Sequence, residues 1–369
     1  MAHKRSADVA RGGLPLLAKR LLLLPMLTAF IVGCQAGSSP TPEVSQAPSA
    51  APSAEPSPSP TAEPNEPRTL RFGHVLAETH PWHQCGVKTF VSEVDRAAVE
   101  VTVEVFPGAQ LGTNEQMVEA LSQGNLDLAL PGVGSVSTLY EEFGVLEAPY
   151  AFRSLDHLFD VWESEIGRQL IDGAVRVGVR PIGLPWYIGF RHVTANKPVR
   201  HPDDLSGVRM RSQDTPISRA IVEALGGSPV PIAFGELYLA LSQGVVDAQE
   251  NPLPNIKAAS LHEVQKYLTL TSHVPQTGVL LISEKTWSKL SSGQQAALSA
   301  AAEIAAKTAK ACIEKAEADI LAEFEKEGSP IAVIKDFDRQ RFEERAVDVI
   351  KNKFGGSWGP LYEQIRNLQ

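Results

Sequence analysis

The chain has 369 residues, of which 43% are hydrophobic and 21% are charged, and its formal net charge at pH 7 is −9. This acidic balance argues against a nucleic-acid partner, because binding to a phosphate backbone depends on clustered Lys and Arg side chains. The length permits two or three domains, but the N-terminal stretch must be set aside before folding is considered.

Residues 1–33 are predicted to be a signal peptide. Basic residues precede an apolar run from Leu21 to Val32, and the run ends in the sequence IVGC at 31–34. The run is too short for a confident membrane span, which needs about 20 apolar residues. IVGC resembles the bacterial lipobox, so Cys34 is expected to be the lipidated first residue of the mature protein. Ordinary cleavage that leaves a free thiol is the alternative. Removal of the segment takes away a net charge of +4, which changes −9 to −13.

Residues 34–67 are expected to be a disordered tether. They hold nine of the 27 prolines, together with Ala, Ser and Glu and almost no large apolar side chains. Such a composition cannot bury enough apolar surface to fold. A lipid at Cys34 and an extended spacer together predict a membrane-anchored, exported protein.

From Arg68 onward the composition is typical of a globular α/β protein with two lobes. The segments TLRFGHV (69–75) and VTVEVF (101–106) are predicted strands around a helix near 83–98. GVRMRS (207–212) is a predicted strand before the helix ISRAIVEALG. This alternation favours largely parallel sheets. An Ala-rich pattern from Gln294 to about Lys326 predicts one helix about 50 Å long, which could run across both lobes.

Two similar units occur 120 residues apart. ALSQGNLDLAL (120–130) and ALSQGVVDAQE (240–250) share ALSQG and an Asp at the same offset, and each predicts a helix that ends at a glycine before a strand. An accidental match is the alternative. Ligands of open α/β sheets bind beyond the carboxyl ends of strands. Gln249, Glu250 and Asn251 in one unit, and 130–132 in the other, are therefore expected to face a crevice. Gln249 and Glu250 are expected mainly to tie down loops between the lobes, and Asn251 to contact ligand.

Two further cysteines, Cys85 and Cys312, follow Cys34, and the sequence leaves open whether they form a disulfide or two buried thiols. His74, His80 and His83 lie close together in the sequence, but no further Cys, His or acidic residue at ligand spacing supports a metal site. A helix-start loop with one histidine near the cleft is the better interpretation, and His74 is the candidate.

The chain resembles the solute-binding subunit of a tripartite ATP-independent periplasmic (TRAP) transporter of the dicarboxylate-receptor family. The resemblance runs from Leu70 to the C-terminus and is carried by three segments: RHVTANKPVRHPDDLSGVRMRS (191–212), GGSPVPIAFGELYLALSQGVVDAQENPL (226–253) and LHEVQKYLTLTSH (261–273). It implies a two-lobed α/β receptor of the periplasmic-binding-protein kind, with a central cleft and a lobe-spanning helix. Such a receptor closes on a small organic acid and delivers it to small and large membrane subunits.

The resemblance also implies the site residues. Arg211, which ends the strand GVRMR, corresponds to the arginine that clamps the carboxylate of the ligand, and a guanidinium suits that role because its planar donors grip a carboxylate with two hydrogen bonds. The other implied ligand contacts are Arg191 (or else a hinge salt bridge), Asn251, Phe234, Trp186 (or else a packing residue), Asn114 and Gly132 in the turn PGVGS. Family members that bind sialic acid carry a glutamate at the position of Gly132, which argues against that ligand.

The expected division is 68–188 plus about 277–316 for lobe 1 and 189–276 plus about 317–369 for lobe 2. No H-E-x-x-H motif, phosphate loop or dinucleotide fingerprint is present and no nucleophile elbow is expected, so neither a cofactor nor catalysis is predicted. A carboxylate-binding lipoprotein that serves an ATP-driven importer or a sensor kinase is the alternative function.

Overall fold

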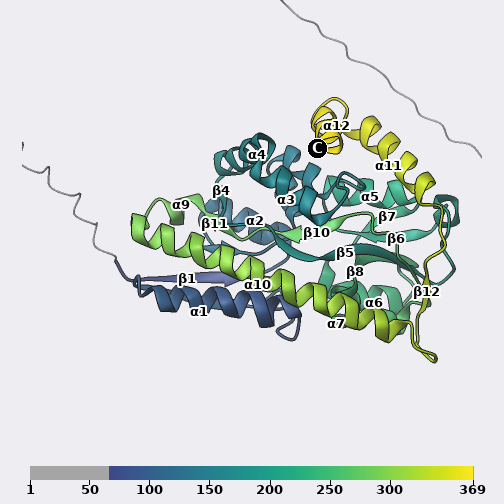
Figure 1. The fold of residues 1–369 in the computed structure, drawn as a ribbon, viewed down its shortest axis with the longest axis horizontal. Coiled ribbons are helices and arrows are strands. Elements are labelled where there is room, and N and C mark those ends of the chain that lie inside the picture. The colour runs from purple at the N-terminus through teal and green to yellow at the C-terminus, as the bar shows by residue number, and fades with distance from the viewer. Residues whose placement is uncertain (1–65, 369) are drawn as a thin grey trace, which may run out of the picture. The chain divides into compact units, whose positions relative to one another are not determined.

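The computed structural model describes residues 66–368 (Figure 1). The predicted signal peptide, Cys34 and nearly all of the predicted tether lie outside the described residues. Within 66–368, none of the helices combines the length and apolar character that a membrane span requires.

The first sheet belongs to the N-terminal lobe. Its five strands run in the order β2 (Val101–Phe106), β1 (Arg68–Gly73), β3 (Leu128–Ala129), β11 (Leu281–Ser283) and β4 (Val179–Pro181). Strand β1 is parallel to β2 and to β3, whereas β11 is antiparallel to both of its neighbours. In β1 and β2 alternate side chains are buried, as the pattern of the sequence predicts for strands with one face on a core.

The second sheet contains the longest strand. The order is β12 (Ala332–Ile334), β9 (Tyr267–Thr269), β5 (Trp186–Ala195), β8 (Ala248–Pro252), β6 (Arg209–Ser212) and β7 (Ser228–Pro231), and β10 (Pro275–Gly278) pairs with the first half of β5. Strand β5 is antiparallel to β8, β9 and β10. The expectation of largely parallel sheets is therefore wrong. The chain crosses between the lobes along β5 and returns along β10 and β11, and returning strands pair antiparallel.

Helices cover both sheets. They are α1 (Lys88–Ala97), α2 (Asn114–Gln123), α3 (Leu155–Glu163), α4 (Glu165–Arg176), α5 (Pro216–Leu225), α6 (Leu237–Ser242), α7 (Leu253–Ala258), α8 (Leu261–Val264), α9 (Glu284–Trp287), α10 (Ser292–Phe324), α11 (Arg339–Phe354) and α12 (Gly359–Asn367). Short helical segments are η1 (Trp82–Val87), η2 (Val133–Thr138), η3 (Glu141–Glu147), η4 (Pro202–Leu205) and η5 (Phe234–Glu236).

The repeated ALSQG units form the same local structure in both lobes. Helix α2 ends at Gly124 (φ 77°) and leads into β3, and α6 is followed by Gly244 (φ 67°) before β8. The left-handed backbone at both positions is accessible to glycine without steric cost, which explains why ALSQG recurs. The predicted order of helix, glycine and strand is confirmed in each unit.

The predicted long helix is α10, which has 33 residues and is about 50 Å long at 1.5 Å per residue. In Figure 1 it runs from α9 and α1 to α7, and it packs against α1, η1, β5 and α7. Its buried face includes Leu298, Ala305, Ala309 and Ile313. A disulfide between Cys85 and Cys312 joins η1 to this helix, which answers the question that the sequence left open.

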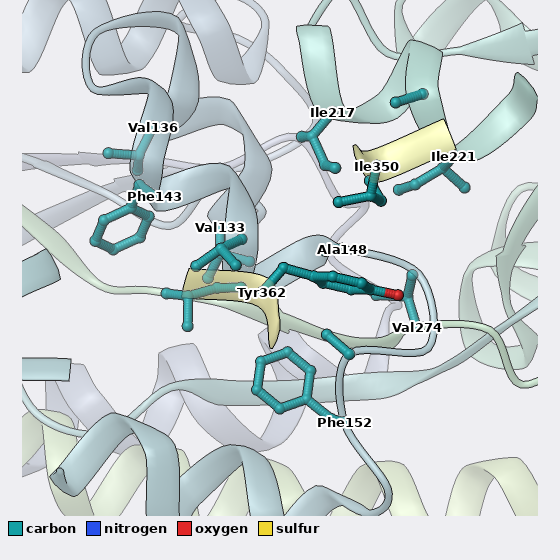
Figure 2. Packing of buried hydrophobic residues seen from close by; sticks show 14 of the residues in the cluster. Val133, Val136, Phe143, Ala148, Phe152, Ile217, Ile221, Val274, Ile350 and Tyr362 are labelled. Carbon is teal, nitrogen blue, oxygen red and sulfur yellow. The ribbon is translucent and has the colours of Figure 1, made fainter. Parts of the chain in front are cut away.

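The C-terminal helices complete a hydrophobic cluster to which both lobes contribute (Figure 2). In the close-up, Tyr362 of α12 lies between Val133 of η2 and Val274, and Ile350 of α11 lies near Ile221 of α5. The hydroxyl of Tyr362 donates to the carbonyl oxygen of Pro149 at 3.0 Å. The cluster packs η2 and η3 of the first lobe against α5 of the second.

Candidate ligand-binding site

A cavity of about 40 Å³ is lined by residues of both lobes and shares Asn114, Arg211, Gln213 and Phe234 with an adjoining cavity of about 340 Å³. The inner cavity is lined by Val75, Leu76, Trp82, Asn114, Leu130, Gly132, Ile188, Arg191, Arg211, Gln213, Phe234, Asn251, Asn255 and Gln276. These positions lie after β1 and β3, in β5 and β10, at or just after the ends of β6 and β8, and in the helical segments η1, α2, η5 and α7. Seven of the fourteen residues are amides or arginines, and convergent polar groups of this kind are typical of small-molecule sites.

A buried ion pair is formed by Arg191 of β5 and Glu250 of β8. Nη2 of Arg191 donates to Oε1 of Glu250 at 2.6 Å and to its carbonyl oxygen at 2.7 Å, and Nε also contacts the carboxylate. The side chain of His273 lies 2.9 Å from Oε2 of Glu250, and Thr271 lies 2.8 Å from the other ring nitrogen. Because a carboxylate only accepts hydrogen bonds, Nε2 of His273 is the donor and Nδ1 the acceptor.

The pKa values of this group agree with a charged pair beside a neutral histidine. Burial raises the pKa of Glu250, but the nearby guanidinium of Arg191 outweighs it and holds the value at about 2. Burial lowers the pKa of His273 despite its hydrogen bond to Glu250. Arg191 also donates through Nη1 to Gln276, so its charge and most of its donors are satisfied within the protein.

Arg211 of β6 is in a different situation. Its side chain is buried, its Nε donates to the carbonyl oxygen of Ile232 at 2.9 Å, and within residues 66–368 it forms no ion pair and no other hydrogen bond. Burial, together with the neighbouring positive charge of Arg191, lowers the pKa of Arg211 to about 10, so the group stays charged at neutral pH. A buried cation without a carboxylate partner is costly unless an anion occupies the cavity.

A chain of hydrogen bonds runs from His80 of the first lobe into the second sheet. The backbone N–H of Trp82 donates to Nδ1 of His80, and Nε2 of His80 contacts Oδ1 of Asn255 at 3.0 Å. Nδ2 of Asn255 donates to Oδ1 of Asn251 at 3.2 Å, and Nδ2 of Asn251 donates to Oε1 of Gln249 at 2.6 Å.

The same chain continues through Gln249, whose Nε2 donates to the hydroxyl of Thr194 at 2.7 Å. Thr194 donates to Gln265 at 3.2 Å, and Gln265 donates to the carbonyl oxygen of Val264. We call this chain, from His80 through Asn255, Asn251, Gln249 and Thr194 to Gln265, the amide relay. A backbone donor at one end and a backbone acceptor at the other fix the direction of every bond in it.

Glu147 lies behind the wall of the cavity. Neither carboxylate oxygen has a hydrogen-bond partner among the described residues, and the end of the side chain fills the space where a Cβ of residue 134 would stand. Burial raises the pKa of Glu147 to about 7, although Arg191 opposes the rise. The carboxyl group therefore titrates near neutral pH.

Six of the predicted ligand-contacting residues line the inner cavity: Arg191, Arg211, Phe234, Asn251, Asn114 and Gly132. Two are placed elsewhere. Trp186 is fully buried and packs edge-on against Trp82 at 5.9 Å, since its position at the start of β5 points it into the core. His74 is buried with Nε2 at 3.0 Å from Nδ1 of His83, and burial lowers its pKa to about 3. Both belong to the packing behind the cavity wall.

Gln249 and Glu250 are expected from the sequence mainly to tie down loops between the lobes. Gln249 belongs instead to the amide relay, whereas Glu250 neutralises Arg191 and also accepts a hydrogen bond from His273 in the loop between β9 and β10. Both are fully buried inside the second lobe, where hydrogen bonds satisfy them.

Five polar or aromatic residues of the site escaped the sequence-based prediction: Trp82, Gln213, Asn255 and Gln276, which line the cavity, and His80, which holds Asn255. Asn255 follows Asn251 by four residues, but Asn251 lies in β8 and Asn255 in α7, so helical spacing does not predict their contact. The others lie in loops, at the start of η1 or on β10, with no local signal.

Residues 66–368 contain neither a cluster of metal ligands nor a serine placed as a nucleophile. No group of three or more His, Cys, Asp or Glu side chains in residues 66–368 is placed to hold a metal ion. The sequence does contain GGSWG (355–359), which fits the G-x-S-x-G pattern that was expected to be absent. Ser357 lies between two helices, however, and not in the strand-to-helix turn that a serine nucleophile requires. Its hydroxyl donates to the carbonyl oxygen of Phe354.

Comparison with known proteins places this geometry in a family. The model of bacterial extracellular solute-binding protein family 7 matches residues 72–356. A solute-binding protein of Roseobacter denitrificans is 33% identical over 299 residues, which cover 80% of this chain and 90% of that protein.

Two solved structures are also similar. A TRAP periplasmic solute-binding protein from Polaromonas, bound to D-erythronate, has a TM-score of 0.76 at 28% identity, with 82% of this chain and 99% of that chain covered. One from Sulfurospirillum deleyianum, with bound succinate, has a TM-score of 0.73 at 29% identity, with coverage of 82% and 99%. A two-lobed fold, a polar cleft between the lobes and a family match over most of the chain lead to one conclusion: this chain belongs to bacterial extracellular solute-binding protein family 7, the DctP family.

Proposed function

We propose that this protein is the extracytoplasmic receptor of a TRAP transporter, which captures a small organic acid in the cleft and delivers it to membrane permease subunits. The observation that carries the proposal is the buried guanidinium of Arg211, a residue that lines the cavity and whose two terminal nitrogens have no partner among residues 66–368. A carboxylate offers two oxygens that match them. The bound acids of the Polaromonas and Sulfurospirillum proteins support this ligand class.

Titration calorimetry with D-erythronate and succinate tests the role of Arg211. Removal of a charged partner from a desolvated site costs about 2–5 kcal/mol, so Arg211→Ala should raise Kd roughly 30-fold to several thousand-fold. Arg211→Lys should raise Kd almost as much, because an ammonium cannot form two parallel hydrogen bonds to one carboxylate.

The matched control is Arg209→Ala. Arg209 lies on the same strand, two residues away, with its side chain 53% exposed and paired with Asp247. Its removal should leave Kd unchanged. A folded Arg211→Ala protein that binds an acid within threefold of wild type would exclude the proposed role. If no acid binds the wild-type protein at all, the receptor function itself is wrong.

We further propose that the receptor binds without chemical turnover. The inner cavity contains no nucleophile beside a general base among its lining residues, since its polar groups are amides and arginines. NMR spectra of a bound acid, recorded after prolonged incubation, should show the unchanged compound. Accumulation of a product would contradict this.

Closure of the lobes is the proposed capture step. Lobe 1 comprises 68–188 plus about 277–316, and lobe 2 comprises 189–276 plus about 317–369, with β5, β10 and α10 passing between them. Ligand bound at both walls stabilises the closed arrangement, so a saturating acid should reduce the radius of gyration in small-angle scattering. Identical curves with and without the acid would contradict closure.

Anchoring at Cys34 is proposed from the sequence alone. A lipobox cysteine before a Pro-rich spacer suits a receptor that must stay near its permease at the cell surface. Mass spectrometry of the mature N-terminus should find a lipid-modified Cys34, and Cys34→Ser should release the protein from the membrane fraction. An unmodified N-terminus at another residue would contradict the anchor.

A further inference from the structure

We infer that the cleft is built for an acid with one carboxylate and several hydroxyl groups, as in a sugar acid, and discriminates against dicarboxylates. This inference rests on the proposed function, in which Arg211 binds a carboxylate, and it adds the chemical class of the rest of the ligand. Three observations carry it: the charge balance of the cavities, the amide groups on their walls, and a buried acceptor without a partner.

The charge balance leaves one cation for the ligand. The charged residues that line the two cavities are Arg191, Arg211, Glu115 and Asp214. Arg191 is neutralised by Glu250, so Arg211 alone remains for an anion. The hydroxyl of Ser135 donates to Glu115 at 3.1 Å, and Glu115 forms no ion pair with a described residue. A second carboxylate would therefore lose its hydration without gaining a cation, and it would face an acidic side chain.

Amides dominate the rest of the polar lining of the inner cavity. Five carboxamide side chains contribute: Asn114, Gln213, Asn251, Asn255 and Gln276. Each amide carries both donors and acceptors, whereas a carboxylate can only accept. A hydroxyl group both donates and accepts, so a row of hydroxyls is the complement of a row of amides.

The amide relay fixes which atoms of two amides remain for the ligand. Asn251 and Asn255 each use one N–H and one acceptor position of the carbonyl oxygen within the relay. Each keeps one N–H and one acceptor position, and neither amide can rotate by half a turn without breaking two hydrogen bonds. A carboxylate oxygen beside them would satisfy the donors and leave the acceptors unpaired.

Asn114, at the start of α2, supplies the strongest single indication. Its Oδ1 is buried and has no hydrogen-bond partner among residues 66–368, and the side chain lines both cavities. An acceptor in this position is satisfied by a donor on the ligand, which a hydroxyl provides and an ionised carboxylate does not.

The test is titration calorimetry on the full mature chain with acids matched in length. The four-carbon set is D-erythronate, succinate and butyrate, and the six-carbon set is L-galactonate, D-glucuronate, adipate and hexanoate. In at least one set, the hydroxy acid should bind about 100-fold more tightly than the dicarboxylate and the unsubstituted acid, because a site built to hydrogen-bond hydroxyls leaves its polar groups unpaired with the analogues. A dicarboxylate or unsubstituted acid as the tightest ligand would overturn the inference and leave the proposed function intact. If no acid binds, both the inference and the proposed function are wrong.

Two variants separate hydroxyl recognition from carboxylate binding. Asn251→Ala should weaken binding of the hydroxy acid by at least tenfold more than binding of the unsubstituted acid, since each lost hydrogen bond to a polar group acts on one ligand only. Arg211→Ala should weaken both acids alike. Asn352→Ala, an exposed position on α11, is the control and should change neither. If Asn251→Ala lowers the affinity for both acids equally, Asn251 has only a structural role, and the inference is overturned.

Discussion

Arg191 and Glu250 form an ion pair whose side chains are only 3% and 1% exposed, and they face each other diagonally across the antiparallel strands β5 and β8. His273 and Gln276 complete the hydrogen bonding of the pair. The ion pair determines which positive charge is available in the cleft, because Glu250 neutralises Arg191 and leaves Arg211 for the ligand.

Loss of one member of this pair should be strongly destabilising. Glu250→Gln leaves Arg191 charged and unpaired in the interior, which typically costs about 3–5 kcal/mol of the free energy of unfolding. Urea denaturation at pH 7 measures it. The control Asp247→Asn breaks the exposed pair with Arg209, and exposed pairs contribute about 0–1 kcal/mol. Equal effects of the two substitutions would show that Arg191 is stabilised by other means.

The amide relay should depend on the ring of His80. His80→Phe leaves the N–H of Trp82 and Oδ1 of Asn255 without partners, which costs about 1–3 kcal/mol for each buried polar group. Affinity for a hydroxy acid should fall as well, because Asn255 loses its fixed orientation. His80→Gln can both donate and accept, so it should restore most of the affinity. If His80→Gln lowers the affinity as much as His80→Phe while both variants fold, His80 contributes through the packing of its ring and does not orient Asn255.

His80 should also contribute to acid sensitivity. Burial lowers its pKa from 6.5 to about 4, although the hydrogen bond to Asn255 opposes the shift. The unfolded chain therefore binds a proton at His80 before the folded protein does, and stability falls as the pH drops from about 6.5 to 4. His80→Gln should flatten the dependence of the free energy of unfolding on pH in this interval. If the slope of the free energy of unfolding against pH is the same in His80→Gln as in the wild type, His80 does not contribute to the acid sensitivity.

Glu147 should lower the stability of the protein as the pH rises, whereas His80 lowers it as the pH drops. Its pKa is about 7 in the folded protein against 4.5 as the ordinary value, so the folded state binds the extra proton and the free energy of unfolding falls as pH rises through that interval. Glu147→Gln should be neutral near pH 4.5 and stabilising at pH 8, by about 3 kcal/mol from 1.36 kcal/mol per pKa unit. Urea denaturation at both pH values measures it. The control Glu141→Gln, at the exposed start of η3, should show no such dependence. The same difference at both pH values would rule out titration of Glu147.

The disulfide should affect stability and not affinity. Neither cysteine lines the cavity, and the bond closes a loop of 227 residues between η1 and α10. The double variant Cys85→Ser, Cys312→Ser should lose about 2–5 kcal/mol and keep its Kd for an acid. Wild-type protein reduced with dithiothreitol should match the variant. A large change in Kd would mean that η1 positions Trp82 through the disulfide.

The sequence by itself determined the local structure and the class of protein. Helix α10 was predictable from its spacing, β1 and β2 from alternation, and Arg211 and Asn251 from motifs that also lie at strand ends. Each of these signals is contained in a few consecutive residues, where the periodicity of backbone geometry appears directly in the order of side chains.

Only the tertiary structure decided which polar groups meet. The pairing of Glu250 with Arg191 joins residues 59 positions apart, and the contact of His80 with Asn255 joins residues 175 positions apart. No pattern in the local sequence indicates such contacts. Trp186 and Trp82 show the same limit, since both are aromatic residues near the cleft, and only the packing of β5 against η1 places one in the core and the other at the cavity. Burial and partnership depend on chain segments brought together by folding, and they determine which side chains remain free to bind a ligand.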